Sequence, residues 1–175
     1  MQGRRIADRA LDVLRDVTTS QLVVANDARA PQWFPGTEVV KDAVAGVGPL
    51  AGLETALAAS SGRPVIVLAW DMPFVTAELL REMARRAAGG VRAVVPSHGA
   101  RAQPQPLCAC YPASALVVCR ELLERGERRA AALAEALPDV EWMRDEALAA
   151  FGDPRSMFTS IDTPEQLAAV GGALP

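Results

Sequence analysis

The spacing of apolar residues changes repeatedly along the chain, and these changes predict an alternation of helices and strands. Between residues 4 and 16 apolar positions recur at helical intervals, which predicts an amphipathic helix. The β-branched run at 22–25 predicts a strand, and the almost continuously apolar run at 64–70 predicts a strand that helices cover on both faces. The other expected strands are 38–40, 93–96, 105–111 and an edge strand at 140–142, and the other expected helices are 53–59, 77–88, 113–124, 128–136 and one that opens at 163–165.

This alternation favours an α/β fold, in which a mostly parallel sheet lies between two layers of helices. The chain has 175 residues and shows no internal repeat, low-complexity tract or shift in composition, so we expect a single domain over 1–175. Hydrophobic residues make up 50% of the chain and charged residues 22%, which is the balance of an ordinary globular domain.

Charge and cysteine content narrow the expected partners and location. The net charge is -3, so neither nucleic acid nor a membrane surface is expected as a partner. The three cysteines are too few for a disulfide framework, and the first residues lack the apolar core of a signal peptide. We therefore expect a cytoplasmic protein.

Polar residues that directly follow predicted strands are the first candidates for chemistry, because ligands of open parallel sheets bind at the carboxyl ends of the strands. Asn26, Asp42 and Asp71 occupy such positions. Mg²⁺ in proteins commonly takes one or two carboxylates together with substrate phosphates, which makes Asp71 a candidate ligand. A cap of the turn before the next helix is an equally good interpretation of Asp71 from its position alone.

A glycine-containing loop, Gly48-Pro49-Leu50-Ala51-Gly52, precedes the helix expected at 53–59. Its glycines allow a close approach of the backbone to a ligand, and the helix N-terminus behind it favours anions. An ordinary tight connection between a strand and a helix is the commoner meaning of such a loop.

The remaining polar features have simpler interpretations. His98 is the only histidine and is expected at the surface, and without a second histidine or a pair of close cysteines a zinc site is not expected. Cys108 and Cys110 share one face of a predicted strand, which is typical of packing. The basic cluster at 125–129 fits either a phosphate site or a solvated helix start.

Taken together and in order, these segments resemble the molybdenum-cofactor guanylyltransferases of the MobA type. The resemblance runs from about Gly3 to the C-terminus. Its segments are the first helix from Gly3, Val23-Val24-Ala25-Asn26, Lys41-Asp42, the 48–52 loop, Leu68 to Phe74 around Asp71, Gln105-Pro106-Leu107, Gly126-Glu127-Arg128-Arg129, and Phe158 to Glu165.

The resemblance implies a three-layer, Rossmann-like nucleotidyltransferase fold of the nucleotide-diphospho-sugar transferase kind. The implied reaction is transfer of GMP from GTP to molybdenum-bound molybdopterin, with molybdopterin guanine dinucleotide and pyrophosphate as products. The implied partners are GTP, molybdopterin and other molybdenum-cofactor proteins, and the implied cofactor is Mg²⁺.

The resemblance also assigns residues. The implied nucleotide-binding residues are Asn26, Asp42, Gly48, Pro49, Leu50, Gly52 and Asp71. Asp71 is the implied catalytic residue and metal ligand, with Asp162 as a second candidate ligand. The implied contacts of the pterin substrate are Gln105, Pro106, Arg128, Arg129, Ser160 and Asp162.

The chain departs from the family pattern at three places. Ser160 and Asp162 stand where the family has asparagines, and Trp70 stands where the family usually has a small residue. Family members also begin with a strand and a loop of the form L-A-G-G-x-S-x-R-M-G-x-D-K, which binds the triphosphate. No such sequence precedes Gly3, so we expect that about 20–25 residues, the first strand and the phosphate loop, are missing.

Three hypotheses follow from this comparison. The native protein is an active guanylyltransferase with a longer start than the sequence shows. Alternatively, the chain is a degenerate member that binds a nucleotide or a pterin without catalysis. In the third, it is a nucleotidyltransferase for another phosphorylated substrate, for example a cytidylyltransferase.

Overall fold

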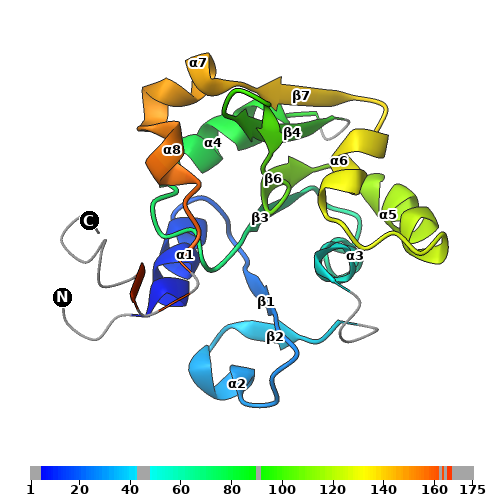
Figure 1. Ribbon diagram of the computed structural model, residues 1–175. Coiled ribbons are helices and arrows are strands. Elements are labelled where there is room, and N and C mark those ends of the chain that lie inside the picture. The colour runs from blue at the N-terminus through cyan, green and yellow to red at the C-terminus, as the bar shows by residue number, and fades with distance from the viewer. Residues whose placement is uncertain (1–4, 43–47, 90–91, 162, 164, 167–175) are drawn as a thin grey trace.

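The computed structural model describes residues 5–42, 48–89, 92–161, 163 and 165–166, and it alternates helices with strands as the sequence predicts (Figure 1). The helices are α1 (Ile6–Arg15), α2 (Ala30–Trp33), α3 (Pro49–Ala59), α4 (Ala77–Arg86), α5 (Ala115–Glu124), α6 (Ala131–Ala136), α7 (Asp145–Leu148) and α8 (Pro154–Met157), with a 3₁₀ turn at Ala149–Phe151. The strands are β1 (Leu22–Val24), β2 (Glu38–Val40), β3 (Val65–Leu68), β4 (Ala93–His98), β5 (Gln103–Pro104), β6 (Cys108–Tyr111) and β7 (Val140–Met143).

Most of the expected elements are confirmed, and the differences are local. The short elements α2, α7, α8 and β5 were not expected from the sequence. The helix expected at 53–59 begins earlier, at Pro49, so most of the predicted glycine loop is the first turn of α3. At the end of the chain, Thr163 and Gln166 exchange side-chain-to-backbone hydrogen bonds, which confirms a helix cap at Thr163.

The strands form two sheets, and a mostly parallel arrangement is not confirmed. β1 and β2 make a parallel pair, and β4 and β7 pair in parallel, whereas β3–β6, β4–β6 and β4–β5 are antiparallel. The connection between β4 and β6 explains the difference, because it consists of turns and β5 without a helix. Parallel neighbours need a crossover of a dozen or more residues, so β6 returns antiparallel to β4.

Two apolar cores lie on the two faces of the five-stranded sheet. Side chains alternate between them along each strand, as the period of a β-strand requires. In β4, Val94 packs in the core with α4 and α7, and Val95 packs in the core with α3, α5 and α6. Cys108 and Cys110 both belong to the first core, which confirms their expected packing role. Burial raises the pKa of Cys110 to about 12, so its thiol is unreactive at neutral pH.

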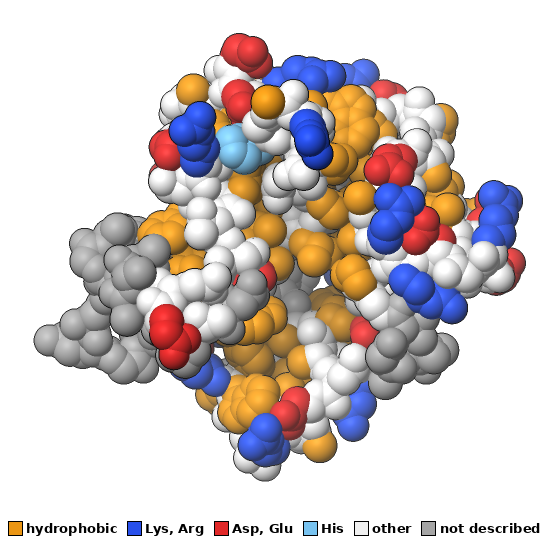
Figure 2. Space-filling view, in the orientation of Figure 1, with side chains coloured by type: hydrophobic (Ala, Val, Ile, Leu, Met, Phe, Trp, Pro, Cys, Tyr) orange, Lys and Arg blue, Asp and Glu red, His pale blue; other side chains and the backbone are white. Residues whose placement is uncertain are grey.

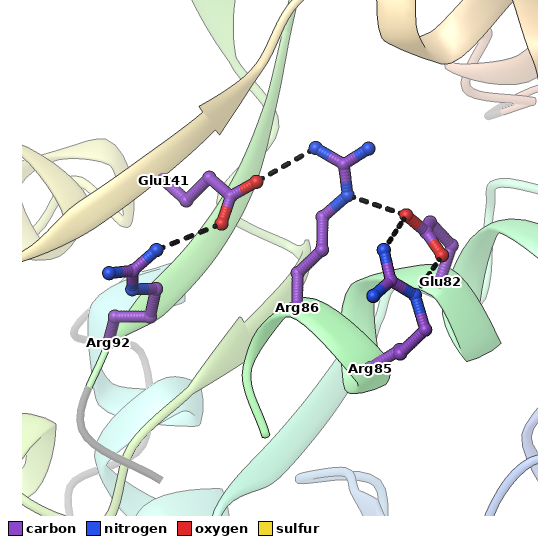
Figure 3. A network of polar contacts seen from close by, with 5 residues as sticks. All are labelled: Glu82, Arg85, Arg86, Arg92 and Glu141. Atoms are coloured by element: carbon purple, nitrogen blue, oxygen red, sulfur yellow. Dashed lines mark hydrogen bonds and ion pairs between the residues drawn. The ribbon is translucent and has the colours of Figure 1, made fainter. Parts of the chain in front are cut away.

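An ion-pair network fixes the edge strand β7 to helix α4 (Figure 3). Arg85 and Arg86 both donate to Glu82, and these hydrogen bonds lower the pKa of Glu82 to about 2. Arg86 also donates to Glu141 of β7, which accepts a second hydrogen bond from Arg92. The network therefore ties one end of the sheet to the helix layer that covers it.

A cavity of about 1070 Å³ separates the two sheets. Residues of β1 and β3 line it together with residues of α1 and α3, and Figure 2 shows hydrophobic side chains around the hollow. Within the described residues, β1 pairs only with β2 and β3 pairs only with β6. Both strands are half-buried, whereas β6 is fully buried. The expectation of an additional strand ahead of α1 stays a prediction.

We predict that backbone amide exchange reports this difference in strand pairing. Amides of β1 and β3 should exchange at least about tenfold faster, averaged over each strand, than those of β4 and β6, because one edge of each has no ladder partner among the described residues. Hydrogen–deuterium exchange resolved by peptide measures this, and α3 and α4 serve as internal references. Equal protection in β3 and β4 would show that the edge of β3 is covered in solution.

Candidate active site

Most of the residues that the sequence nominates for nucleotide binding line the same cavity. They follow β1, β2 and β3 or lie at the start of α3, so the carboxyl ends of three strands meet there. The predicted residues that line the cavity are Asn26, Asp42, Gly48, Pro49, Gly52 and Asp71. Their convergence is an observation of the structure, and their role in binding stays a prediction.

Asn26 and Asp42 form a reciprocal hydrogen-bonded pair at the ends of β1 and β2. The Asn26 amide Nδ2 donates to Asp42 Oδ2 over 2.8 Å, and the Asp42 backbone N–H donates to Asn26 Oδ1 over 3.1 Å. The second carboxylate oxygen of Asp42, Oδ1, is buried and has no hydrogen-bond partner within the described part of the chain. Asn26 therefore holds the Asp42 carboxylate in place, and Asp42 Oδ1 is an acceptor left for a ligand.

Helix α3 begins against the backbone of Arg128, and this contact explains the glycine before it. Gly48 has φ 97 and ψ 176, a conformation that only glycine adopts without strain. A Cβ at this position would lie 3.1 Å from the Arg128 carbonyl oxygen. The same oxygen accepts a hydrogen bond from the Leu50 N–H, and Ala51 N–H bonds to Gly48 O.

These bonds limit what the start of α3 can bind. Because its first N–H donors already have partners, this helix end offers little to a phosphate. The Leu50 side chain is fully buried in the core and does not line the cavity, so its predicted contact with the nucleotide has no support from its position. Gly52 is different, because a Cβ there would lie 3.8 Å from Asp42 Oδ1. A Cβ at Gly52 would thus be in ordinary contact with this carboxylate oxygen.

Asp71 lies in a turn that is held from two sides. The Met72 N–H bonds to Ala69 O across the turn, and the Ala69 N–H bonds to Leu107 O next to β6. On the other side, the Ile161 N–H donates to Asp71 O over 2.9 Å. The backbone around Asp71 is therefore fixed by both the sheet and the C-terminal segment.

The Asp71 carboxylate favours the metal interpretation over the capping one. Its Oδ1 atom is buried and has no hydrogen-bond partner. Helix α4 is capped by Thr76 instead, whose hydroxyl accepts from the Leu79 N–H over 3.3 Å. An unpartnered carboxylate oxygen at a cavity wall fits a hard cation that takes its other ligands from phosphates and water. Among the described residues no cluster of three or more His, Cys, Asp or Glu side chains could hold a metal alone.

Of the residues predicted on the pterin side, those that the structure describes do not line this cavity. Gln105 and Pro106 lie in the connection to β6, where Pro106 O accepts from the Tyr111 hydroxyl. Ser160 directly precedes Ile161 and so lies near the backbone of Asp71. Asp162 falls outside the described residues.

The side chains of the basic turn after α5 pair with neighbouring residues, and Arg128 and Arg129 do not line the cavity. Arg128 donates to the carbonyl oxygens of Leu123 and Glu127, and Arg129 pairs with Glu127 and Glu135. These interactions match the solvated helix start better than a phosphate site.

Sequence reasoning missed two features near these strand ends. Trp70 lines the cavity beside Asp71 and is 60% exposed. The expectation of a surface-exposed His98 is wrong, because its side chain is half-buried and its Nδ1 lies 2.8 Å from Asp145 Oδ1. Asp145 comes from the unexpected helix α7, so nothing in the local sequence around His98 could have indicated the pair.

Comparison with known proteins gives a consistent result for sequence and for structure. The family model described as MobA-like NTP transferase domain matches residues 1–140. A protein of Opitutus terrae named probable molybdenum cofactor guanylyltransferase is 34% identical over 151 residues, which cover 85% of this chain and 73% of the relative.

Solved structures agree with this comparison. The crystal structure of molybdopterin-guanine dinucleotide biosynthesis protein A from Archaeoglobus fulgidus superimposes with a TM-score of 0.76 at 27% identity, covering 99% of this chain and 87% of that one. The 2-C-methyl-D-erythritol 4-phosphate cytidylyltransferase of Thermus thermophilus gives a TM-score of 0.71 at 19% identity, covering 98% of this chain and 89% of that one. This second likeness shows the fold alone.

Alanine substitutions at Gly48 and Gly52 should show that the fold requires glycine at the first position and tolerates a Cβ at the second. Gly48→Ala should lower the free energy of unfolding by about 1–3 kcal/mol, because alanine is strained at this φ and meets Arg128 O. Gly52→Ala should change it by less than about 1 kcal/mol, because a Cβ fits within helix α3. Urea denaturation of both variants gives the comparison, and equal losses would contradict the described start of α3.

Proposed function

The chain belongs to the family of MobA-like NTP transferases, and we propose that it transfers GMP from GTP to molybdenum-bound molybdopterin. The products of this reaction are molybdopterin guanine dinucleotide and pyrophosphate. The family membership makes the protein a nucleotidyltransferase, and the relatives named as molybdenum cofactor guanylyltransferases support the choice of substrates. The single observation that carries the proposal is the cavity in which Asn26, Asp42 and Asp71 converge.

Asp42 is suited to select guanine. Guanine presents two neighbouring donors, N1–H and the N2 amino group, on the edge that pairs in nucleic acids. An ionised carboxylate only accepts hydrogen bonds, and the Oδ1 oxygen of Asp42 is buried and free to do so. Asn26 orients this carboxylate by occupying its other oxygen, and Gly52 places no side chain against the free one.

Asp71 is suited to hold a magnesium ion at the phosphates. Bound Mg²⁺ would neutralise charge that develops on the phosphates during the displacement. The turn between Ala69 and Met72 fixes where the carboxylate lies, so Asp71 would hold the ion at this part of the cavity. Arg63 is the one Lys or Arg side chain among the described residues that line the cavity. Little else in this lining offsets the charge of a triphosphate.

The reaction needs no nucleophile from the protein, because the acceptor supplies a phosphate oxygen that attacks the α-phosphorus of GTP. The chain's part is to align donor and acceptor and to keep the base, the metal carboxylate and the acceptor in a fixed relation.

We place this reaction in the cytoplasm. The described cysteines are free, as expected of a reducing compartment, and among the described helices none is long and apolar enough to cross a membrane.

A panel of nucleotides tests the base selection. The chain should bind GTP with Mg²⁺ more tightly than ATP, CTP or UTP, and release pyrophosphate from GTP when molybdopterin is supplied. Asp42→Asn should reduce the preference for GTP by about tenfold or more, because an amide nitrogen in place of Oδ1 opposes the guanine donors. Calorimetry and a coupled pyrophosphate assay measure the two steps. A preference for CTP would refute the guanylyl assignment, and guanine-specific binding without turnover would identify a non-catalytic member.

We predict that Asp71→Asn removes most of the Mg²⁺-dependent turnover while leaving the fold intact. The amide matches the carboxylate in shape and loses its charge, so the metal binds weakly and turnover should fall by at least about a hundredfold. Thermal unfolding should be nearly unchanged, because Asp71 Oδ1 has no hydrogen-bond partner to lose. Mg²⁺ titrations of pyrophosphate release compare the two proteins, and near-normal turnover in the variant would rule out the metal role.

A further inference from the structure

Trp70 is a large apolar side chain that remains exposed at the wall of the cavity. Its exposed fraction is 60%, and it lines the cavity together with Asp71. The described part of the chain has one other exposed tryptophan, Trp33, and there the guanidinium of Arg29 covers the ring at 5.0 Å from its centroid. No such ring or cation contact is found for Trp70 among the described residues.

The exposure of Trp70 is not the result of a loose loop. Trp70 and Asp71 are the two central residues of the turn that the bond from Met72 N to Ala69 O closes. That turn is tied to Leu107 through Ala69 and to Ile161 through Asp71. The backbone therefore presents an indole ring and an unpartnered carboxylate side by side at the same cavity.

An aromatic ring held in this way suits a planar ring of a ligand whose phosphate lies nearby. Aromatic side chains stack on heteroaromatic rings without requiring a particular hydrogen-bond pattern, because every such ring has a π-face. GTP and molybdopterin both fit this description. Guanine and the pterin each contain a fused 2-amino-4-oxopyrimidine ring, and both substrates carry phosphate.

We propose that Trp70 stacks on the fused heteroaromatic ring of a phosphorylated substrate and thereby positions it next to Asp71. This role deepens the proposed function and rests on it for the identity of the ring. The substrate's ring covers the indole, and its phosphate reaches the carboxylate in the same turn. Trp70 is then a residue of binding and specificity, whose loss acts on affinity rather than on the fold.

Binding measurements on the full chain with three probes test the proposal. The probes are GTP with Mg²⁺, 6-hydroxymethylpterin, and inorganic tripolyphosphate as a ligand without a ring. Trp70→Ala should weaken GTP or the pterin about five- to hundredfold and leave tripolyphosphate unchanged, while Trp70→Phe keeps most of the affinity. The ring whose affinity falls identifies the source. Trp33→Ala is the matched control, because Trp33 does not line the cavity. This variant should bind all three probes as the native chain does.

Fluorescence supplies a second readout that a structural role would not change. In the double variant Trp33→Phe/Trp142→Phe, Trp70 is the only tryptophan, and the ring ligand should quench its emission in a saturable way. The thermal unfolding temperature of Trp70→Ala should equal that of the native chain, because the Trp70 side chain is mostly exposed.

Two results would overturn the proposal. One is native affinity of Trp70→Ala for every ring ligand that the unaltered chain binds, and the other is an equal loss for tripolyphosphate. Adding CTP to the probes distinguishes failure of the stacking proposal from failure of the proposed function. A chain that prefers CTP refutes guanylyl transfer, while the effect of Trp70→Ala on CTP relative to tripolyphosphate still decides whether Trp70 stacks on a ring.

Discussion

Within the described residues, strand β6 is the element on which the rest of the structure depends, because it is the ladder partner of both β3 and β4. Its side chains enter both cores, with Cys110 on one face and Tyr111 on the other. Leu107, just before β6, accepts the hydrogen bond that holds Ala69. The pairing of β6 with β3 therefore sets where β3 ends, and with it the position of the turn that carries Asp71.

The sequence was sufficient to predict those elements and residues whose causes are local. Apolar spacing predicts α1 and α4, and β-branched runs predict β1 and β3 close to their observed bounds. The rule that ligands bind at strand carboxyl ends nominated Asn26, Asp42 and Asp71, and the structure brings all three to one cavity. This rule needs only that β1, β2 and β3 end at the same side, so the three residues meet although the larger sheet is not mostly parallel.

Features that depend on pairing over long distances could not be predicted in the same way. The direction of β6 follows from the short connection after β4, and the apolar run at 105–111 looks the same in either direction. The hydrogen bond between His98 and Asp145 joins residues that lie 47 positions apart in the sequence, and Asp145 belongs to a helix of only four residues. Likewise, the sequence left Asp71 open between a cap of its turn and a metal ligand, and the structure adds that its Oδ1 atom has no hydrogen-bond partner among the described residues. The sequence pattern also does not indicate the hydrogen bonds and ion pairs that hold the side chains of Arg128 and Arg129.

The site is divided between two sheets that share no ladder among the described residues. Asn26 and Asp42 follow the β1–β2 pair, whereas Trp70 and Asp71 follow β3 of the larger sheet. Their separation is therefore set by helices α1 and α3, which line the cavity between the sheets. In-line displacement at phosphorus tolerates little misplacement of the reacting groups. The packing of α1 and α3 thus bears on the proposed catalysis as directly as the polar residues do, because it determines how far Asp42 lies from Asp71.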